Sequence, residues 1–345
     1  IIELIGGAEG AAKKLVFNAL KNKKHVVTAN KALIAKYGDQ LAKIAEKNNV
    51  NLEFEASVCG GLPIIRALKE GLIANKISKI YGIFNGTSNF ILSSMDKHNK
   101  NFDEVLFNAK KFGYAESNPS ADLNGSDVSS KLKILSSLCF NSFLNNNIYV
   151  EGINNIDKDD IENANKLGYK IKLLGYAELL NNIIYQRVHP TLIKKSSYVA
   201  SIDGVLNAVI INGVPVGQSI IQGEGAGPAA TTSALISDIS SILRGNIKFP
   251  FSISNKERKN LIFKDISNRS FSAYLRFEVK DKSGVLSNIT SIFSTQNVSI
   301  KRLIQNPNKN KGSSSIIVIT HLSKNKSLYK IIKAVNKRSY VLKKS

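Results

Sequence analysis

The chain has 345 residues, of which 43% are hydrophobic, and it carries a formal net charge of +22. This length and composition predict a folded protein of two or three domains and exclude a disordered chain. Its only cysteines, Cys59 and Cys139, have no histidine or further cysteine grouped around them, which excludes a disulfide framework and zinc-ligand spacing and indicates a reducing, cytoplasmic compartment.

Residues 1–75 alternate strand-like and helix-like segments. Apolar runs at 1–5, 25–28 and 51–55 predict strands, and the stretches between them carry apolar residues at helical spacing. This alternation is typical of βαβ units around a mostly parallel sheet. The chain begins in the middle of the first run and its only methionine is Met95, so we expect an amino-terminal segment to precede this sequence.

Three further regions follow in the chain. Residues 76–247 combine helices with longer strands, which indicates an α+β domain whose open mixed sheet carries a substrate site and a subunit interface; the strands are expected at 77–84, 149–153, 183–188 and 205–211. Residues 248–270, with Pro250 and scattered charges, are predicted to be a linker. Residues 271–345 show a compact βαββαβ pattern, the ferredoxin-like order.

Residues 113–131 contain the chemically richest stretch. After Gly125, four apolar residues fall on one stripe of a helix: Val128, Leu132, Leu135 and Cys139. Asp127 and Lys131 are four positions apart and can touch, which on most surface helices is an ordinary ion pair worth about 0.2–0.5 kcal/mol. Here the preceding loop adds Glu116 and Asp122, so three carboxylates gather beside one ammonium group. A surface helix does not require that loop.

This stretch resembles the segment of homoserine dehydrogenases that binds substrate and supplies the catalytic lysine. The resemblance continues, in the family's order, through residues 27–32 (Val-Thr-Ala-Asn-Lys-Ala), 55–64 (Glu-Ala-Ser-Val-Cys-Gly-Gly-Leu-Pro-Ile), 85–90 (Asn-Gly-Thr-Ser-Asn-Phe) and 188–191 (Val-His-Pro-Thr). It implies a partial Rossmann-like cofactor domain over 1–75 and a catalytic and dimerisation domain over 76–247. It also implies a role in threonine, methionine and isoleucine biosynthesis, as a homodimer or homotetramer.

The family's chemistry implies a role for each polar residue of the 113–131 stretch. Lys131 matches the catalytic lysine, which protonates the oxygen of L-aspartate 4-semialdehyde as hydride reaches the aldehyde carbon and L-homoserine forms. Asp127 would orient this lysine and contact the substrate, and Glu116 would receive the substrate's amino group. Gly113 would supply nearby backbone, and Asp122 a supporting contact.

The resemblance also implies a nicotinamide cofactor, NAD or NADP. Lys31 follows the strand that ends at Thr28, at the edge where open α/β sheets bind ligands, although its spacing alone fits a solvated lysine. The resemblance places Lys31 between nicotinamide and substrate, with Thr28 nearby and Gly227 approaching the cofactor from the far side. The Gly-x-Gly-x-x-Gly turn that holds the pyrophosphate is absent from this sequence, which leaves the preference between the two cofactors open.

The turn after Glu55 resembles the family's monovalent cation site, which usually holds sodium. Hard cations prefer oxygen ligands, and a tight glycine turn can direct backbone carbonyls inward. Glu55, Val58, Gly60 and Leu62 are therefore the expected ligands. The residue types by themselves fit a plain strand-to-helix turn equally well.

Two other segments invite a functional interpretation that the residues do not favour. His189, between Val188 and Pro190, fits a structural strand end better than a general base. Residues 223–228 (Gly-Glu-Gly-Ala-Gly-Pro) lie between a strand and a helix, as a phosphate loop does, but the last glycine of that motif is missing.

Residues 274–293 resemble the opening of an ACT domain. Gly284 lets the backbone turn tightly into a helix whose free N–H groups can meet a carboxylate. ACT domains commonly bind amino acids at this turn, often across a dimer, so the resemblance implies threonine as the effector. The alternative is a domain that only mediates assembly.

Two alternatives to a dehydrogenase remain at the level of the whole chain. Because the nucleotide-binding turn is absent, the chain could be an amino-acid-sensing or assembly protein without catalysis. A nucleic-acid-binding protein would cluster its basic residues on one face, but here the lysines are spread along nearly every segment and only 333–344 comes close to such a cluster. No run of about 18 apolar residues occurs. We therefore expect neither a nucleic-acid nor a membrane partner.

Overall fold

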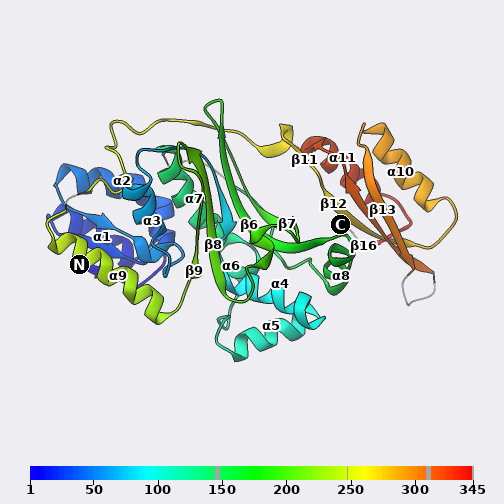
Figure 1. The fold of residues 1–345 in the computed structure, drawn as a ribbon, viewed down its shortest axis with the longest axis horizontal. Coiled ribbons are helices and arrows are strands. Elements are labelled where there is room, and N and C mark those ends of the chain that lie inside the picture. Colours follow the sequence, from blue (N-terminus) through cyan, green and yellow to red (C-terminus); the bar gives the residue numbers. More distant parts are fainter. Residues whose placement is uncertain (144–147, 247, 308–311, 344–345) are drawn as a thin grey trace. The chain divides into compact units, whose positions relative to one another are not determined.

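The structure is a computed structural model that describes residues 1–143, 148–246, 248–307 and 312–343 (Figure 1). It divides into two units, Ile1–Lys264 and Asp265–Ser345. No helix among the described residues has both the length and the apolar content needed to cross a lipid bilayer.

A small parallel sheet opens the first unit. Its strands are β1 (Ile2–Glu3), β2 (Val26–Thr28) and β3 (Leu52–Glu53), in that order across the sheet, joined by helices α1 (Ala11–Lys21) and α2 (Lys31–Lys47). The predicted βαβ alternation is therefore confirmed, with shorter strands than expected. Helix α2 begins where the Asn30 side chain accepts a hydrogen bond from the backbone N–H of Leu33, which satisfies one of the free donors of the first turn.

A seven-stranded mixed sheet forms the rest of the first unit's framework. Its order is β10 (Ile262–Phe263), β7 (Ile183–Lys194), β6 (Tyr169–Leu180), β4 (Lys76–Ile83), β8 (Leu206–Val214) and β9 (Gly217–Glu224), while β5 (Tyr149–Val150) pairs with β7. The pairings of β7 with β10 and with β5 are parallel, and the others are antiparallel.

Helices cover one face of this sheet. Helices α4 (Gly86–His98), α7 (Ser126–Phe140) and α8 (Lys158–Lys166) contact the central strand β6 directly, while α5 (Phe102–Lys111) packs on α4, and α6 (Ser120–Leu123) packs on α4 and α7 (Figure 1). Because side chains alternate along a strand, Ile80 and Val209 face the helix-covered core, whereas Ile83 and Ile210 belong to a smaller cluster with the 3₁₀ turn η3 (Tyr198–Ser201). The α+β prediction is confirmed.

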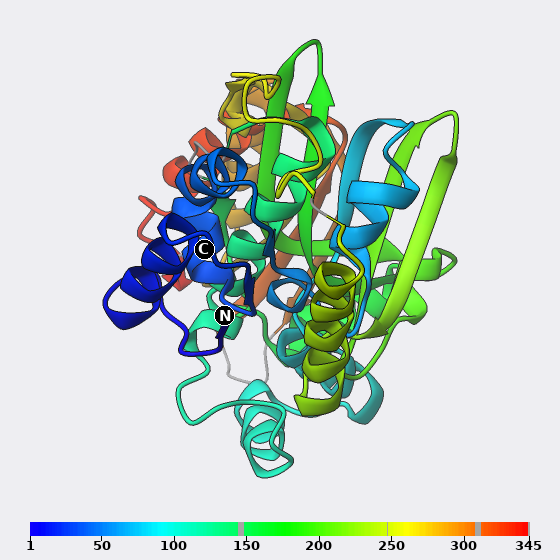
Figure 2. The same ribbon diagram turned by 90° about the vertical axis from the view of Figure 1, so that its left-hand side faces the viewer.

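Between the two sheets lie η1 (Glu55–Ser57), the short helix α3 (Ile64–Arg66) and the π-helical turn η2 (Ala67–Gly71). Helix α9 (Pro228–Leu243), although it follows β9 in the chain, packs against β2 and η1 and stands beside the amino-terminal segment in Figure 2. The sequence boundary at 76–247 assigned this helix to the second region. Its packing partners are instead β2 of the parallel sheet and η1, where the buried Asp238 accepts a hydrogen bond from the backbone N–H of Glu55 at 3.0 Å.

Residues 248–264 differ from the predicted linker. Phe251 is fully buried against the Phe54 ring, with 5.3 Å between ring centroids. Arg258 is 5% exposed and donates hydrogen bonds to Asp39 and Ser137, each at 2.6 Å. The segment then adds strand β10 to the sheet. It is therefore an ordered part of the first unit, since an arginine can be buried only where such acceptors meet it.

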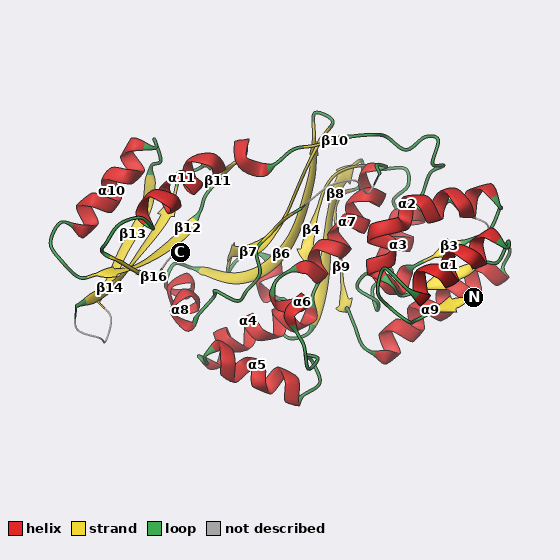
Figure 3. Cartoon of the chain, turned by 180° about the vertical axis from the view of Figure 1, so that it is seen from behind, coloured by secondary structure: helices red, strands yellow, loops and turns green. Residues whose placement is uncertain are grey.

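The second unit has the predicted βαββαβ order. It comprises η4 (Ile266–Asn268), β11 (Ser270–Phe271), β12 (Tyr274–Lys280), α10 (Val285–Thr295), β13 (Ile300–Pro307), β14 (Ser313–Thr320), β15 (Ser323–Lys324), α11 (Asn325–Val335) and β16 (Val341–Lys343). The sheet order is β13-β14-β12-β16, and β11 pairs separately with β15. Helices α10 and α11 pack together on the sheet (Figure 3), where Ile289 and Ile331 meet Phe277 and Val318.

Candidate active site

The predicted acid and lysine lie in the first two turns of α7. Gly125 precedes the helix with φ 83°, a left-handed conformation that suits glycine. Its α-carbon also lies so close to Val150 and Val188 that a β-carbon would stand 3.0 and 3.2 Å from their methyl groups. The turn therefore fixes where α7 begins. Both Asp127 and Lys131 are buried, with 6% and 8% of their surface exposed. They are therefore not an ion pair on the solvent-exposed face of the helix, which their spacing also allowed.

Asp127 is the centre of the cluster. Its Oδ1 lies 2.9 Å from the Lys31 ammonium nitrogen, and its Oδ2 lies 2.9 Å from that of Lys131. A third donor, the side-chain amide of Asn85, reaches Oδ2 at 2.9 Å. One carboxylate thus joins the start of α2, the end of β4 and α7, three segments far apart in the sequence.

The Lys131 ammonium has two recorded partners. Besides Asp127, it donates to the backbone carbonyl of Phe84 at 2.7 Å. A lysine has three N–H donors, and the structure records no third partner for this one among the described residues. A buried ammonium that is held at two points and retains one donor is suited to pass a proton to a ligand oxygen.

The charges of this cluster determine its ionisation. Burial alone would raise the pKa of Asp127, but the positive charges of Lys131 and Lys31 outweigh burial and hold the pKa well below its ordinary value. Burial acts against the charged form of Lys131 as well, yet the Asp127 carboxylate outweighs it and leaves the lysine pKa raised. Both groups therefore stay charged at neutral pH, and the lysine keeps its proton.

Asp122 joins the cluster through Asn85. The Asn85 amide donates to Asp122 Oδ1 at 2.7 Å, and burial raises the pKa of Asp122. Sequence reasoning missed Asn85, although it begins the 85–90 motif. The signal available was its position after strand 77–84, where a side-chain oxygen commonly caps a helix.

Lys31 is held in place by a buried network below it. The Glu3 carboxylate accepts from the backbone N–H of Ile5 and Gly6 and from the Thr28 hydroxyl, the last at 2.6 Å. That hydroxyl in turn accepts from the N–H of Asn30. Thr28 is fully buried, and its side chain supports the turn before Lys31. Glu3, at the end of the first strand, was missed because an isolated glutamate in a strand carries no motif.

The structure does not join Glu116 to the cluster by any contact. Its side chain is exposed, and no hydrogen bond or ion pair is recorded for it within the described part of the chain. Gly113 lies just beyond the end of α5 with φ 75° and is also exposed. The expected group of three carboxylates beside Lys131 is thus two carboxylates, Asp122 and Asp127, joined by an amide.

The predicted cation ligands surround the turn after η1. The Glu55 carboxylate accepts from the backbone N–H groups of Ile65 and Arg66 at 2.8 and 2.7 Å, and burial raises its pKa to about 7. The turn is tightly constrained, because a β-carbon at Gly61 would stand 2.2 Å from the carbonyl oxygen of Glu224. Within the described residues, no backbone N–H is recorded as a donor to the carbonyls of Val58 and Gly60.

Gly227 and His189 lie in different settings from the cluster. Gly227 is exposed, has φ 112° and precedes α9, whose first turn has no side-chain cap. His189 is in the middle of β7, paired with Leu174, so the prediction of a strand end is wrong. The strand continues through Pro190, and burial lowers the pKa of His189 to about 4. Its ring nitrogen Nδ1 contacts the Pro190 carbonyl at 2.7 Å, which fits a structural role.

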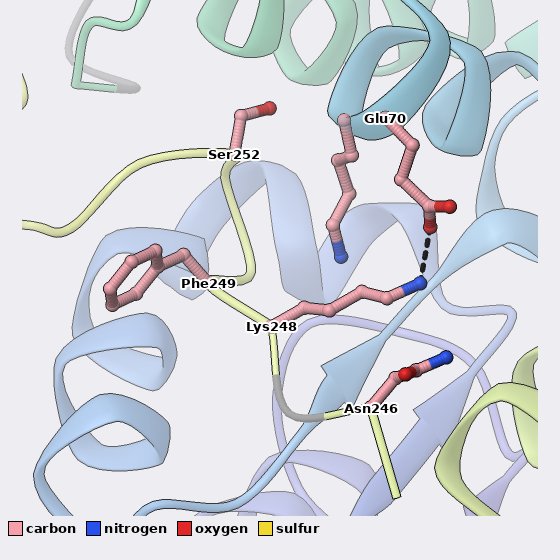
Figure 4. Close-up of a pocket in the computed structure, with 6 residues that line it drawn as sticks. Glu70, Asn246, Lys248, Phe249 and Ser252 are labelled. Carbon is pink, nitrogen blue, oxygen red and sulfur yellow. Dashed lines mark hydrogen bonds and ion pairs between the residues drawn. The ribbon is translucent and has the colours of Figure 1, made fainter. Parts of the chain in front are cut away.

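A surface pocket lies elsewhere in the first unit (Figure 4). It is lined by Lys69, Glu70, Asn246, Lys248, Phe249 and Ser252, and an ion pair joins Lys248 to Glu70. None of the predicted site residues lines it. The chemistry therefore belongs to the buried cluster around Asp127.

The fold and cluster define a class of protein. A parallel αβ sheet whose carboxyl edge presents Lys31 lies next to a fixed ammonium group, which is the arrangement of a nucleotide-dependent oxidoreductase. Three family models match the chain, namely the homoserine dehydrogenase NAD-binding domain over residues 1–55, homoserine dehydrogenase over 63–240 and the ACT domain over 273–339.

Relatives and solved structures agree with these matches. Homoserine dehydrogenase of Neisseria gonorrhoeae is 42% identical over 97% of this chain and 78% of its own length, and that of Helicobacter pylori is 39% identical over 99% and 80%. The crystal structure of a homoserine dehydrogenase from Thiobacillus denitrificans superposes with a TM-score of 0.92 at 39% identity, covering 99% of this chain and 80% of the other. This chain belongs to the homoserine dehydrogenase family and is an oxidoreductase of that type.

Proposed function

We propose that the chain interconverts L-aspartate 4-semialdehyde and L-homoserine with Lys131 as the proton donor and acceptor. The observation that carries this proposal is the buried Lys131 ammonium, held by Asp127 at 2.9 Å and by the Phe84 carbonyl at 2.7 Å with one donor left for a ligand. A reduced nicotinamide, when bound, would supply hydride to the aldehyde carbon in the reductive direction. The oxygen then gains negative charge, and the third Lys131 N–H supplies the proton that completes the alcohol.

Substrate binding is assigned to the residues around this donor. Asp127 orients Lys131 and offers its carboxylate to the substrate, and Asp122 supports it through the shared amide. Lys31, whose side chain is 43% exposed, is the group of the cluster most open to a ligand and would contact both substrate and nicotinamide. Glu116 and Gly113 would bind the substrate's amino group. Glu116 is exposed, so in this role it makes its contact only when substrate is present.

The residues present fit a nicotinamide cofactor. Gly227 leaves the first N–H groups of α9 without a side-chain cap, which suits a phosphate group at a helix amino terminus. Gly6 and Gly7, both with positive φ, follow β1 at the edge of the parallel sheet beside Lys31. A hyperthermophilic archaeal homoserine dehydrogenase solved in complex with NADPH has a TM-score of 0.62 at 28% identity, covering 72% of each chain. NADP or NAD is therefore assigned to this edge.

The turn after Glu55 fits a monovalent cation such as sodium. The carbonyls of Val58 and Gly60 are hard oxygen donors without a recorded backbone partner in the described residues, and those of Glu55 and Leu62 lie in the same turn. The buried Glu55 carboxylate, whose pKa is raised to about 7, would be stabilised in its charged form by a cation nearby.

Regulation and assembly are assigned to the remaining features. Gly284 precedes α10 with φ 84° and the helix has no side-chain cap, so its N–H groups can receive the carboxylate of an amino acid, with threonine as the proposed effector. The enzyme would act in the cytoplasm, in threonine, methionine and isoleucine biosynthesis, as a homodimer or homotetramer. Loss of activity on titration with L-threonine, but not with L-valine, is the measurement for the effector.

The test of the proposed reaction is homoserine-dependent reduction of NAD and of NADP by the full-length protein. Lys131→Ala should lower turnover by about 10²–10⁴-fold, the usual contribution of a general acid or base, while cofactor binding measured by fluorescence titration stays close to that of the wild type. Lys111→Ala, an exposed lysine at the end of α5, is the matched control and should keep full activity. Undiminished turnover in Lys131→Ala would remove the mechanism.

A further inference from the structure

Asn85 connects groups that the reaction uses, although nothing in the proposed chemistry assigns it a role. It stands between β4 and α4 and is 5% exposed. Its side-chain oxygen accepts from the backbone N–H of Ser88 at 2.7 Å and thereby caps α4. Its side-chain nitrogen has two hydrogens, and these reach Asp122 at 2.7 Å and Asp127 at 2.9 Å. Both N–H donors of this amide are therefore used and its oxygen accepts one hydrogen bond, so its orientation is determined by its partners.

The two carboxylates need such a neutral donor between them. Asp122 and Asp127 repel each other, which is one reason why the pKa of Asp122 is raised, after burial. One amide N–H donates to each of the two carboxylates and reduces this repulsion. The amide is neutral, so it adds no positive charge that would compete with Lys131 for the carboxylates. The neighbouring residue, Phe84, supplies the carbonyl that holds Lys131. Two consecutive residues of one turn thus position both the acid and the lysine of the pair.

We propose that Asn85 is a positioning residue of the dehydrogenase reaction, which acts by holding Asp122 and Asp127 as a fixed pair beside Lys131. The inference rests on the proposed function of Lys131. The charged and titratable groups that act on the lysine are Asp127, Asp122 and the buried Cys59 thiol, with Lys31 bound to the other oxygen of Asp127. A change at Asn85 alters the charge that Lys131 experiences through the two carboxylates, so it alters the pH dependence of proton transfer as well as the rate.

Two substitutions separate this role from helix capping. Asn85→Asp keeps the oxygen that caps α4, removes both donors and adds a third carboxylate. It should lower kcat/KM for homoserine by about 100-fold, the scale expected for misplaced reacting groups. It should also move the ascending limb of the pH profile, where Lys131 must lose its proton, to higher pH by about 1 unit or more, because an additional negative charge favours the ammonium form.

Asn85→Ser also keeps a good capping group but is too short to reach either carboxylate. It should lower kcat/KM by about tenfold and move the ascending limb of the pH profile to higher pH by less than Asn85→Asp does. If Asn85→Asp does not fold, Asn85→Ser is the variant that tests the inference. The control is Asp157→Ala, which removes the cap of α8, a helix that supplies none of the clustered groups. It should lower the midpoint of thermal unfolding and leave kcat/KM and the pH profile unchanged.

The outcomes distinguish this inference from the proposed function. If Asn85→Ser keeps the wild-type pH limb and kcat/KM while Lys131→Ala is inactive, the inference is overturned and the mechanism stands. A loss of activity in Asn85→Ser with an unmoved limb, and with a thermal shift like that of Asp157→Ala, would also overturn it, because the role would then be structural. Full activity in Lys131→Ala would instead overturn the proposed function.

Discussion

The two units of this protein bury their polar groups in opposite ways. In the described part of the first unit, residues 1–143, 148–246 and 248–264, ten charged side chains are buried, among them Asp127, Lys131 and the Glu53–Lys69 pair at 2.9 Å. Among the second unit's residues whose burial is described (265–267, 269–307 and 312–342), the buried polar side chains are serines and a threonine, and no charged side chain is buried. Its core is instead an apolar cluster that includes Phe277, Ile289 and Ile331.

This difference matches the work assigned to each unit. Taking a charge out of water costs several kcal/mol, which its partners recover only with good geometry. In a unit that performs proton and hydride transfer, buried charges are useful despite this cost, because a charge fixed in a site of low dielectric acts strongly on a nearby ligand. A domain that needs only a stable sheet and an exposed turn can rely on apolar packing. The predictions below break the charge cluster, then the apolar core, then one titrating side chain.

Asp127→Asn should have the largest effect. It leaves Lys31 and Lys131 without their shared counter-charge, and breaking a buried ion pair from one side costs about 3–5 kcal/mol of unfolding free energy. Turnover should fall as well, because the lysine loses its orientation. Denaturant unfolding and homoserine-dependent cofactor reduction measure the two effects. Asp103→Asn, on the exposed side of α5, should change neither, and an equal loss there would show that the cluster is not special.

Ile289→Ala should act on the second unit alone. This side chain is fully buried between α10 and the sheet, and its truncation should cost about 2–5 kcal/mol of unfolding free energy for that unit. Calorimetry should show a lower transition for residues 265–345 while kcat/KM for homoserine without effector is retained. Leu322→Ala, 76% exposed in the same unit, is the control and should change stability by less than about 0.5 kcal/mol. A matching loss of activity in Ile289→Ala would contradict the division into separate cores.

His189 should give the first unit a stability that depends on pH, by a smaller amount. Burial lowers its pKa to about 4 from an ordinary value of 6.5, so between these pH values the unfolded chain binds a proton that the folded chain does not. Unfolding free energy should therefore rise with pH from about 4 to about 6.5, by an amount on the order of 1–3 kcal/mol. His189→Gln should flatten that part of the curve. A curve of unchanged slope in this variant would exclude the histidine as its source.

Much of the architecture could be predicted from local patterns. Helical spacing placed Val128, Leu132, Leu135 and Cys139 on one buried stripe of α7, and all four are buried. The βαββαβ order of the second unit followed from alternating strand and helix periods, although the pairing of β12 with β14 and β16 joins strands that are not neighbours in the chain. The pair of Asp127 and Lys131 was visible for the same reason, since residues four apart share a helix face.

The rest depended on contacts between segments distant in the sequence, about which local periodicity carries no information. Asp127 reaches Lys31 and Asn85 only because α2 and the end of β4 are brought to α7 by packing. The same packing excluded Glu116 from the cluster, ordered residues 248–264 through Arg258 and carried α9 to the parallel sheet. Sequence alone determined which residue types could perform the chemistry and most helix faces. Tertiary structure decided which of those residues meet, because a buried charge is stable only where partners from several elements converge on it.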